Sequence, residues 1–218
     1  GLQIPPVKLM KQGRLDRELL ALVMQNVRTR KLTEGDIMAQ IAANHVAIQR
    51  MAEVIDKRGL NRVIASMKEL LDYAERSMRA GIRRIPPGAY TFEDVLEGDG
   101  FTNDLIRIKA TVTVRKDTVV VDFAGTDQQA RGPINTRISA AKACVYYVLK
   151  CVIDPDLPTN SGAYRPIEVR AEEGSVVQAR FPAAVCNANI TTDQRYVDVL
   201  LGALLKAAPE RVPAACSG

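Results

Sequence analysis

The stretch TVVVDFAGTDQQARGPIN, residues 118–135, is the most informative part of the sequence. Its first six residues, 118–123, are mostly β-branched or aromatic, which predicts a strand within a sheet. Gly125, Gly132 and Pro133 then interrupt strand pairing and let the backbone approach another group closely. Loops that follow a rigid strand often carry function, so we expect a ligand site among the polar residues of this junction. The candidate site residues are Asp122, Thr126, Arg131 and Asn135.

The residues around this stretch predict a small sheet with helices packed on it. Residues 105–114 and 118–123 flank Arg115-Lys116-Asp117, which is the pattern of a β-hairpin over 105–123. Residues 89–96 are expected to add a strand. Beyond the hairpin we expect, in order, a helix over 137–152 capped by Thr136, a strand pair at 167–172 and 175–180, and a helix over 194–208.

The first 85 residues have the helical period instead. An extended lead-in over 1–13 precedes a helix from Asp16 to about Arg28. A second helix is expected to start at Thr33 or Asp36 and end before Gly59, and a third runs from Asn61 to about Ile82. The fold class is therefore α/β (α+β): an N-terminal helical segment, 1–85, followed by a mixed or antiparallel sheet with packed helices, 86–218. We expect both to be parts of one larger subunit.

The composition excludes several classes of protein. The 218 residues are 47% hydrophobic, so the chain is neither disordered nor fibrous. Its net charge of +5 is spread among interleaved acids, which argues against a nucleic-acid partner. No apolar run of about 20 residues is present, so we expect no membrane span. The four cysteines form no CxxC pair and are expected to be reduced, small hydrophobic residues in a soluble cytoplasmic protein: Cys144, Cys151, Cys186 and Cys216.

A second polar run, residues 187–195, stands immediately before the last apolar helix. The start of a helix surrounded by amides and hydroxyls suits an anion or an amide-containing ligand. The alternative is structural, with Thr192 or Asp193 capping the helix and the asparagines shaping a loop. The candidate site residues of this run are Asn189, Thr192, Gln194 and Arg195.

Other potential sites have simpler structural explanations. The single histidine, His45, lies within a helix and cannot form a His-rich metal site alone, so a surface or structural role is expected. Cys186 lacks a histidine partner that would activate it as a nucleophile. Asp154 and Asp156 alternate with prolines and are expected to shape a turn rather than bind a metal. Because no glycine-rich phosphate loop is present, we expect this segment to bind no nucleotide. We also expect it to bind no metal.

Several motifs occurring in order resemble the hydantoinase B family, whose members include the B-type parts of 5-oxoprolinases, N-methylhydantoinases and acetone-type carboxylases. The resemblance covers nearly the whole chain. The matching motifs are IPPVKL at residue 4, GDIMAQIAAN (35–44), LLDYAERSMR (70–79), VDFAGTDQQARGPIN (121–135), VYYVLKCVIDPDLPTNSGAYRPIEV (145–169), NANITTDQRYVDVLLGAL (187–204) and PERVPAACSG (209–218).

The resemblance implies a function as well as a fold. It implies a hydrolase that opens a cyclic amide, such as hydantoin, 5-oxoproline or a related lactam, after ATP phosphorylates the amide oxygen. It also implies a hetero-oligomer in which ATP is held by a hydantoinase A-type subunit, with a divalent metal in the full complex. The family's metal-binding region in carboxylases would precede Gly1 in the sequence. The motifs assign no individual catalytic residue.

Two alternatives to this function stay open at the level of sequence. Some relatives carboxylate ketones such as acetone. The other alternative is a non-catalytic scaffold, whose long helices over 36–83 would bury apolar stripes against the A-type subunit or another copy. Because the sequence begins GLQIPPVKL without an initiator methionine and stops at PAACSG, we expect an internal fragment that is inactive alone.

Overall fold

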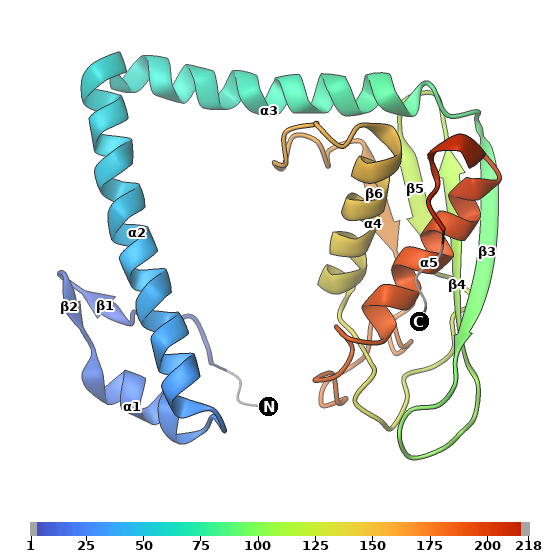
Figure 1. Cartoon of the computed structure of the whole chain (residues 1–218), viewed down its shortest axis with the longest axis horizontal. Coiled ribbons are helices and arrows are strands. Elements are labelled where there is room, and N and C mark those ends of the chain that lie inside the picture. Colours follow the sequence, from blue (N-terminus) through green and yellow to red (C-terminus); the bar gives the residue numbers. More distant parts are fainter. Residues whose placement is uncertain (1–3, 215–218) are drawn as a thin grey trace. The chain divides into compact units, whose positions relative to one another are not determined.

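The computed structural model describes residues 4–214, which form two compact units that meet within one helix, at Met67 and Lys68. The boundary predicted near residue 85 lies just after the C-terminal end of this helix, at Ile82, and not within the helix. The division into two domains stays a prediction. The element order, however, has the predicted character: helices precede the main sheet (Figure 1). No helix among the described residues combines the length and apolar content needed to cross a membrane.

The first unit contains a short hairpin and two helices. Strands β1 (Met10–Lys11) and β2 (Arg14–Leu15) pair across Gln12 and Gly13, which have positive φ, so the expected extended lead-in instead folds back. Helix α1 (Arg17–Gln25) is capped by Asp16, whose Oδ1 accepts a hydrogen bond from the Leu19 N–H at 3.0 Å. Helix α2 (Arg30–Arg58) follows.

Helix α2 starts earlier than predicted, because Thr29 is its N-cap residue and Thr33 and Asp36 lie inside it. It ends at Gly59, whose φ of 83° is readily adopted only by glycine. Helix α3 (Leu60–Ile82) follows directly, so Asn61 is a helical residue rather than a cap.

The second unit is built on a four-stranded sheet of order β3-β4-β5-β6. The first three strands are antiparallel, and β5 and β6 are parallel. The hairpin predicted for 105–123 corresponds to β4 and β5, with Val114 paired to Val119. The four strands are β3 (Gly88–Leu96), β4 (Ile106–Val114), β5 (Val119–Asp122) and β6 (Ile167–Arg170).

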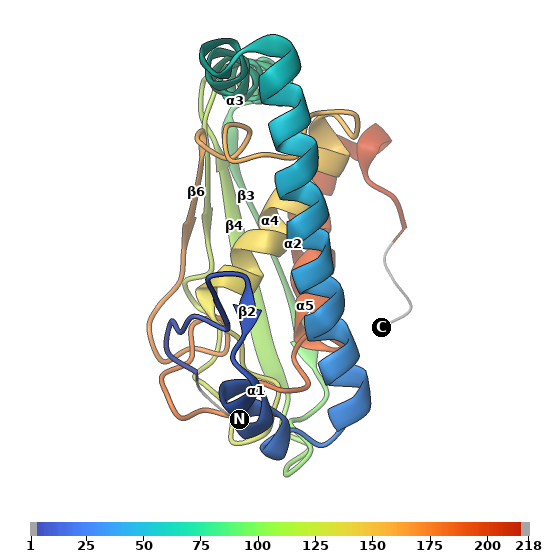
Figure 2. The same cartoon turned by 90° about the vertical axis from the view of Figure 1, so that its left-hand side faces the viewer.

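Helices α4 (Ile138–Ile153) and α5 (Thr192–Leu205) lie on one face of this sheet, as both views show (Figures 1 and 2). Alternate residues of β4 are buried, which matches the period of a strand with one face on the core. The core lies between the sheet and these helices, and it includes Ala74, Met78 and Ile82 of α3. The 3₁₀ helix η1 (Pro209–Arg211) is the last element described.

Two local predictions in this unit are wrong. Residues 175–180 form no strand: the chain turns at Gly174, and the backbone of Val176 bonds instead to Asp127 and Thr136. Thr136 does not cap α4, because it is buried and its hydroxyl contacts the Val177 carbonyl at 3.0 Å and the Tyr196 hydroxyl at 2.7 Å. Arg137 is the N-cap residue of α4.

Candidate functional site

The turn after β5 is fixed by its own polar side chains. Oδ1 of Asp122 accepts a hydrogen bond from the Ala124 N–H at 2.9 Å. The buried Thr126 hydroxyl both accepts from the Lys109 N–H and donates to the Lys109 carbonyl, each at 3.1 Å. Thr126 thus continues the pairing with β4 through its side chain. These contacts give Asp122 and Thr126 a structural role at the end of the sheet.

Asn135 is completely buried and holds three neighbouring loop segments together. Its Oδ1 accepts from the Ala130 N–H at 2.7 Å. Its Nδ2 donates to the carbonyl oxygens of Ala130, Gly132 and Ala184 at 2.8, 2.9 and 3.0 Å. Because the amide is surrounded by backbone partners, Asn135 shapes the junction rather than presenting a group to a ligand.

Asp99 is a buried residue of this junction that the sequence analysis missed. Its carboxylate accepts from the N–H groups of Thr102 at 3.0 Å, Phe101 at 2.9 Å and Gly132 at 2.7 Å. These hydrogen bonds, with that of Thr102 the largest contribution, lower the pKa of Asp99 below its usual value. Gly132 has no room for a side chain here, because a Cβ atom would overlap the backbone of Asp99. The acid between Gly98 and Gly100 was the available sequence signal.

Arg131 lies on the surface of the same junction. Its guanidinium carbon stands 4.8 Å from the centre of the Phe101 ring, in a cation–π arrangement. Both side chains are exposed. The structure therefore does not place Arg131 with the other predicted arginine, Arg195, which lines a pocket elsewhere in this unit.

The second polar run lies beside the first. The Asn187 N–H donates to the Pro133 carbonyl at 2.9 Å, and the buried Thr192 hydroxyl donates to the Ile134 carbonyl at 2.6 Å. Thr192 and Asp193 belong to α5, and neither is its N-cap: that position is Thr191, which makes no capping side-chain bond. Asn189 is exposed and does not line the pocket that contains Arg195. Of the four candidates in this run, only Gln194 and Arg195 line a pocket.

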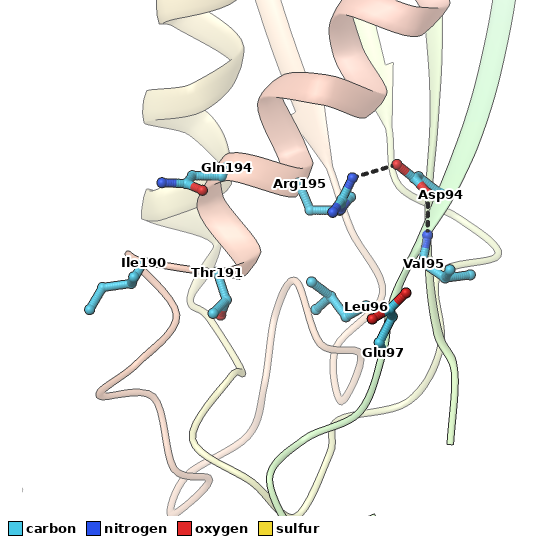
Figure 3. A pocket seen from close by; sticks show the side chains of 8 residues that line it. All are labelled: Asp94, Val95, Leu96, Glu97, Ile190, Thr191, Gln194 and Arg195. Carbon is cyan, nitrogen blue, oxygen red and sulfur yellow. Dashed lines mark hydrogen bonds and ion pairs between the residues drawn. The ribbon is translucent and has the colours of Figure 1, made fainter. Parts of the chain in front are cut away.

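This pocket of about 500 Å³ lies between the end of β3 and the first turn of α5 (Figure 3). Two acids that the sequence analysis did not select line this pocket: Asp94 of β3, and Glu97, the first residue after that strand. Their position at the end of the strand expected over 89–96 could have marked them as candidate site residues. Nothing in the sequence showed that they lie near α5. The lining residues are Asp94, Val95, Leu96, Glu97, Ile190, Thr191, Gln194 and Arg195.

An ion pair orients the guanidinium of the pocket. Arg195 Nη1 is 2.6 Å from Asp94 Oδ2 and 3.6 Å from Asp198 Oδ2 (Figure 3 shows the first of these). Oδ1 of Asp94 accepts from the Val95 N–H at 2.8 Å, which fixes the carboxylate in turn. Nε of Arg195 is buried and donates to no atom of the described chain. The lining thus carries two carboxylates, one guanidinium and the neutral amide of Gln194, a charge balance that disfavours a polyanion.

The thiols near α5 differ in accessibility. Cys144 is buried against α5, and this burial, aided by nearby Asp193, raises the pKa of its thiol to about 12. Cys151 and Cys186 are exposed, so the prediction that the cysteines serve as buried hydrophobic residues is wrong for these two. Cys216 lies outside the described residues. His45 is exposed on α2. Within residues 4–214 no three His, Cys, Asp or Glu side chains are grouped to hold a metal ion.

The sequence as a whole matches one family model, that of hydantoinase B/oxoprolinase, over residues 1–218. The chain belongs to this family. Its relatives include an uncharacterized protein of Methanocaldococcus jannaschii, MJ0963, which is 39% identical over 218 residues. They also include the beta subunit of the caprolactamase of Pseudomonas jessenii, which is 35% identical over 98% of the chain. The chain spans only 38% and 37% of the lengths of these two proteins.

The hydantoinase B fold is also that of solved structures. The ATP-dependent caprolactamase of Pseudomonas jessenii matches 97% of the chain with a TM-score of 0.87 and 34% identity, over 36% of its own chain. An acetone carboxylase matches 99% of the chain with a TM-score of 0.85, over 31% of its own chain. At 19% identity, this second likeness is one of fold. These matches confirm the predicted resemblance and the α/β class.

Proposed function

We propose that the chain is the part of a B-type subunit that helps to bind the ring of a cyclic amide, in an enzyme that opens hydantoin, 5-oxoproline or a related lactam with ATP. The observation that carries the proposal is the pocket between β3 and α5, where an oriented guanidinium, an amide and a second carboxylate line one cavity. The similarity to a caprolactamase, a protein named for a cyclic amide, supports the choice of substrate class.

The chemistry of the lining suits a neutral amide. A lactam offers one N–H donor and one carbonyl acceptor. Glu97 is an acceptor for the N–H, whereas Gln194 both donates and accepts. The first turn of α5 and the cation of Arg195 favour the carbonyl oxygen, which is the negative end of the amide dipole. We therefore assign these three side chains to binding and orientation of the ring, and not to proton transfer.

ATP and a divalent metal belong to the same proposal, as ligands of other parts of the complete enzyme. The described residues have no glycine-rich phosphate loop, and the pocket carries more carboxylate than guanidinium. We propose that a hydantoinase A-type subunit supplies the ATP site in a cytoplasmic hetero-oligomer. Two relatives are named as single subunits of a hydantoinase and of a caprolactamase, which supports a partner of another kind.

The two alternatives have less support. For ketone carboxylation, the structural likeness to acetone carboxylase supports the fold alone. A purely structural role would leave the pocket without a ligand. The exposed surface of α2 nevertheless favours an additional role in assembly.

The decisive test substitutes pocket residues in the complete enzyme. Gln194→Leu and Glu97→Leu remove polar groups that line the pocket, so kcat/KM for ATP-dependent ring opening should fall about 10- to 100-fold. Turnover is measured with hydantoin, 5-oxoproline and caprolactam, and assembly by size-exclusion chromatography. Gln49→Leu is the matched control, since Gln49 is an exposed residue of α2. If both pocket variants turn over every lactam like the wild type, the pocket is not the ring site.

A further inference from the structure

Helix α2 exposes an unusual amount of uncharged surface. None of its 29 residues is buried. Between Asp36 and Arg50 it has no Asp, Glu, Lys or Arg, and beyond these two charges the side chains of Leu32 and Val54 are 71% and 46% exposed. A long helix of this composition gains most of its stability from contacts with other elements, because propensity alone stabilises a helix poorly in water. The surface of α2 is therefore a candidate binding surface.

One face of α2 has a mirror-symmetric order of residues about Ala43. At about 100° per residue, seven positions between Leu32 and Val54 lie within about 40° of the direction of Ala43. Toward either end of the helix, an alanine lies four residues from Ala43, a charged residue lies seven residues away, and a branched apolar residue lies eleven residues away. All seven side chains are exposed, and we call them the α2 seam: Leu32, Asp36, Ala39, Ala43, Ala47, Arg50 and Val54.

We propose that the α2 seam binds the seam of a second copy of this chain, with the two helices antiparallel about a two-fold axis at Ala43. Because the axis passes through residue 43, the numbers of two facing residues add up to 86. Leu32 meets Val54, and Asp36 meets Arg50. Ala39 meets Ala47, and Ala43 meets its own symmetry mate. A two-fold interface must be self-complementary in this way.

The charges select this orientation. An antiparallel pair has two contacts between Asp36 and Arg50, whereas a parallel pair in register would oppose like charges at both positions. In the single chain, Arg50 is paired with Glu53 at 2.9 Å, but both side chains are more than 60% exposed. Such an exposed pair contributes little stability, so Arg50 can exchange it for an intermolecular contact at small cost.

The apolar residues of the seam also suit close packing against a second helix. Small residues at Ala39, Ala43 and Ala47 let two helices approach to the short end of the usual interaxial range, about 8 Å. The seven-residue separation of Asp36, Ala43 and Arg50 keeps the seam directed at a partner helix along its length. The partly buried residues Thr33, Ile37 and Ile41 lie on another side of α2, so the seam does not compete with contacts inside the unit.

Charge reversal tests the proposal directly. By sedimentation equilibrium, the wild-type chain should form a dimer that dissociates on dilution. Asp36→Arg alone and Arg50→Asp alone should each weaken the dimer at least about tenfold, because both intermolecular contacts become repulsive. The double variant should restore it, and a mixture of the two single variants should form a heterodimer. Asp56→Arg is the matched control, since this exposed residue lies on nearly the opposite side of the helix.

Cross-linking tests the register independently. In a chain with Cys151 and Cys186 replaced by serine, Ala43→Cys should form an intermolecular disulfide on mild oxidation, since symmetry brings the two thiols together. Ala52→Cys, an exposed position on the opposite side of α2, should not. Circular dichroism checks that each variant stays helical. The proposal is overturned by a wild-type chain that is monomeric at every concentration, by equal cross-linking at both positions, or by charge reversals that weaken only the association with an A-type subunit.

Discussion

The two compact units of the chain bury apolar side chains to very different extents. Within residues 4–67, only Leu20, Met24 and Val63 are buried apolar residues, and α2 contributes none. Within residues 68–214, the sheet and helices α4 and α5 enclose a continuous core. The first unit therefore depends on contacts beyond its own core, whereas the second has the packing of an independent domain. The pocket lies in the second unit and the α2 seam in the first.

The greatest loss of stability is expected where the second unit is most tightly packed. Gly132→Ala should lower the free energy of unfolding by about 4 kcal/mol, because the new methyl group would overlap the backbone of Asp99. Urea denaturation followed by far-UV circular dichroism measures the change, since the chain has no tryptophan to report by fluorescence. Gly35→Ala in α2 is the control, with nothing within 4 Å of the added Cβ. A loss below about 1 kcal/mol would show that the loop yields easily.

The next largest change in stability is expected from truncating a buried apolar side chain in the second unit, compared with an exposed one in the first. Leu204→Ala removes a fully buried side chain of α5 and should cost about 3 kcal/mol. Ile48→Ala, at a side chain that is 68% exposed, should change stability by less than about 0.5 kcal/mol. Both variants are compared by denaturation at low protein concentration. Equal losses would mean that α2 is covered in solution even when copies are dissociated.

The sequence predicted those features that depend on local pattern. The β-branched run before Asp122 and the apolar periods of the helices were sufficient for the strands of the hairpin and for the helices. Features that depend on distant partners could not be predicted: Thr136 bonds to Val177 and Tyr196 rather than to its own helix. Likewise, Arg195 meets Asp94 from 101 positions away. A polar residue's type shows that it needs partners, but not where the fold places them.

A smaller, pH-dependent effect is expected at the buried acid of the second unit. The pKa of Asp99 is lowered in the folded chain, so its contribution to stability is present above the unfolded value of about 3.9 and is lost as pH falls through the lower folded value. Asp99→Asn also places an amide against the Gly132 N–H. The variant should be less stable than the wild type near neutral pH, and the difference should shrink below about pH 3.9. A difference that is independent of pH would contradict a depressed pKa at Asp99.

The smallest expected effect is a gain in the first unit. Gly35→Ala should stabilise α2 by about 0.5–1 kcal/mol, because alanine loses less backbone entropy in a helix and the added Cβ meets no atom within 4 Å. Hydrogen exchange read by mass spectrometry should show slower exchange along α2 and unchanged exchange in α4. If α4 were protected to the same extent, the two units would unfold as one cooperative structure. Slower exchange confined to α2 would instead show that the exposed helix opens without the core, as its lack of buried residues predicts.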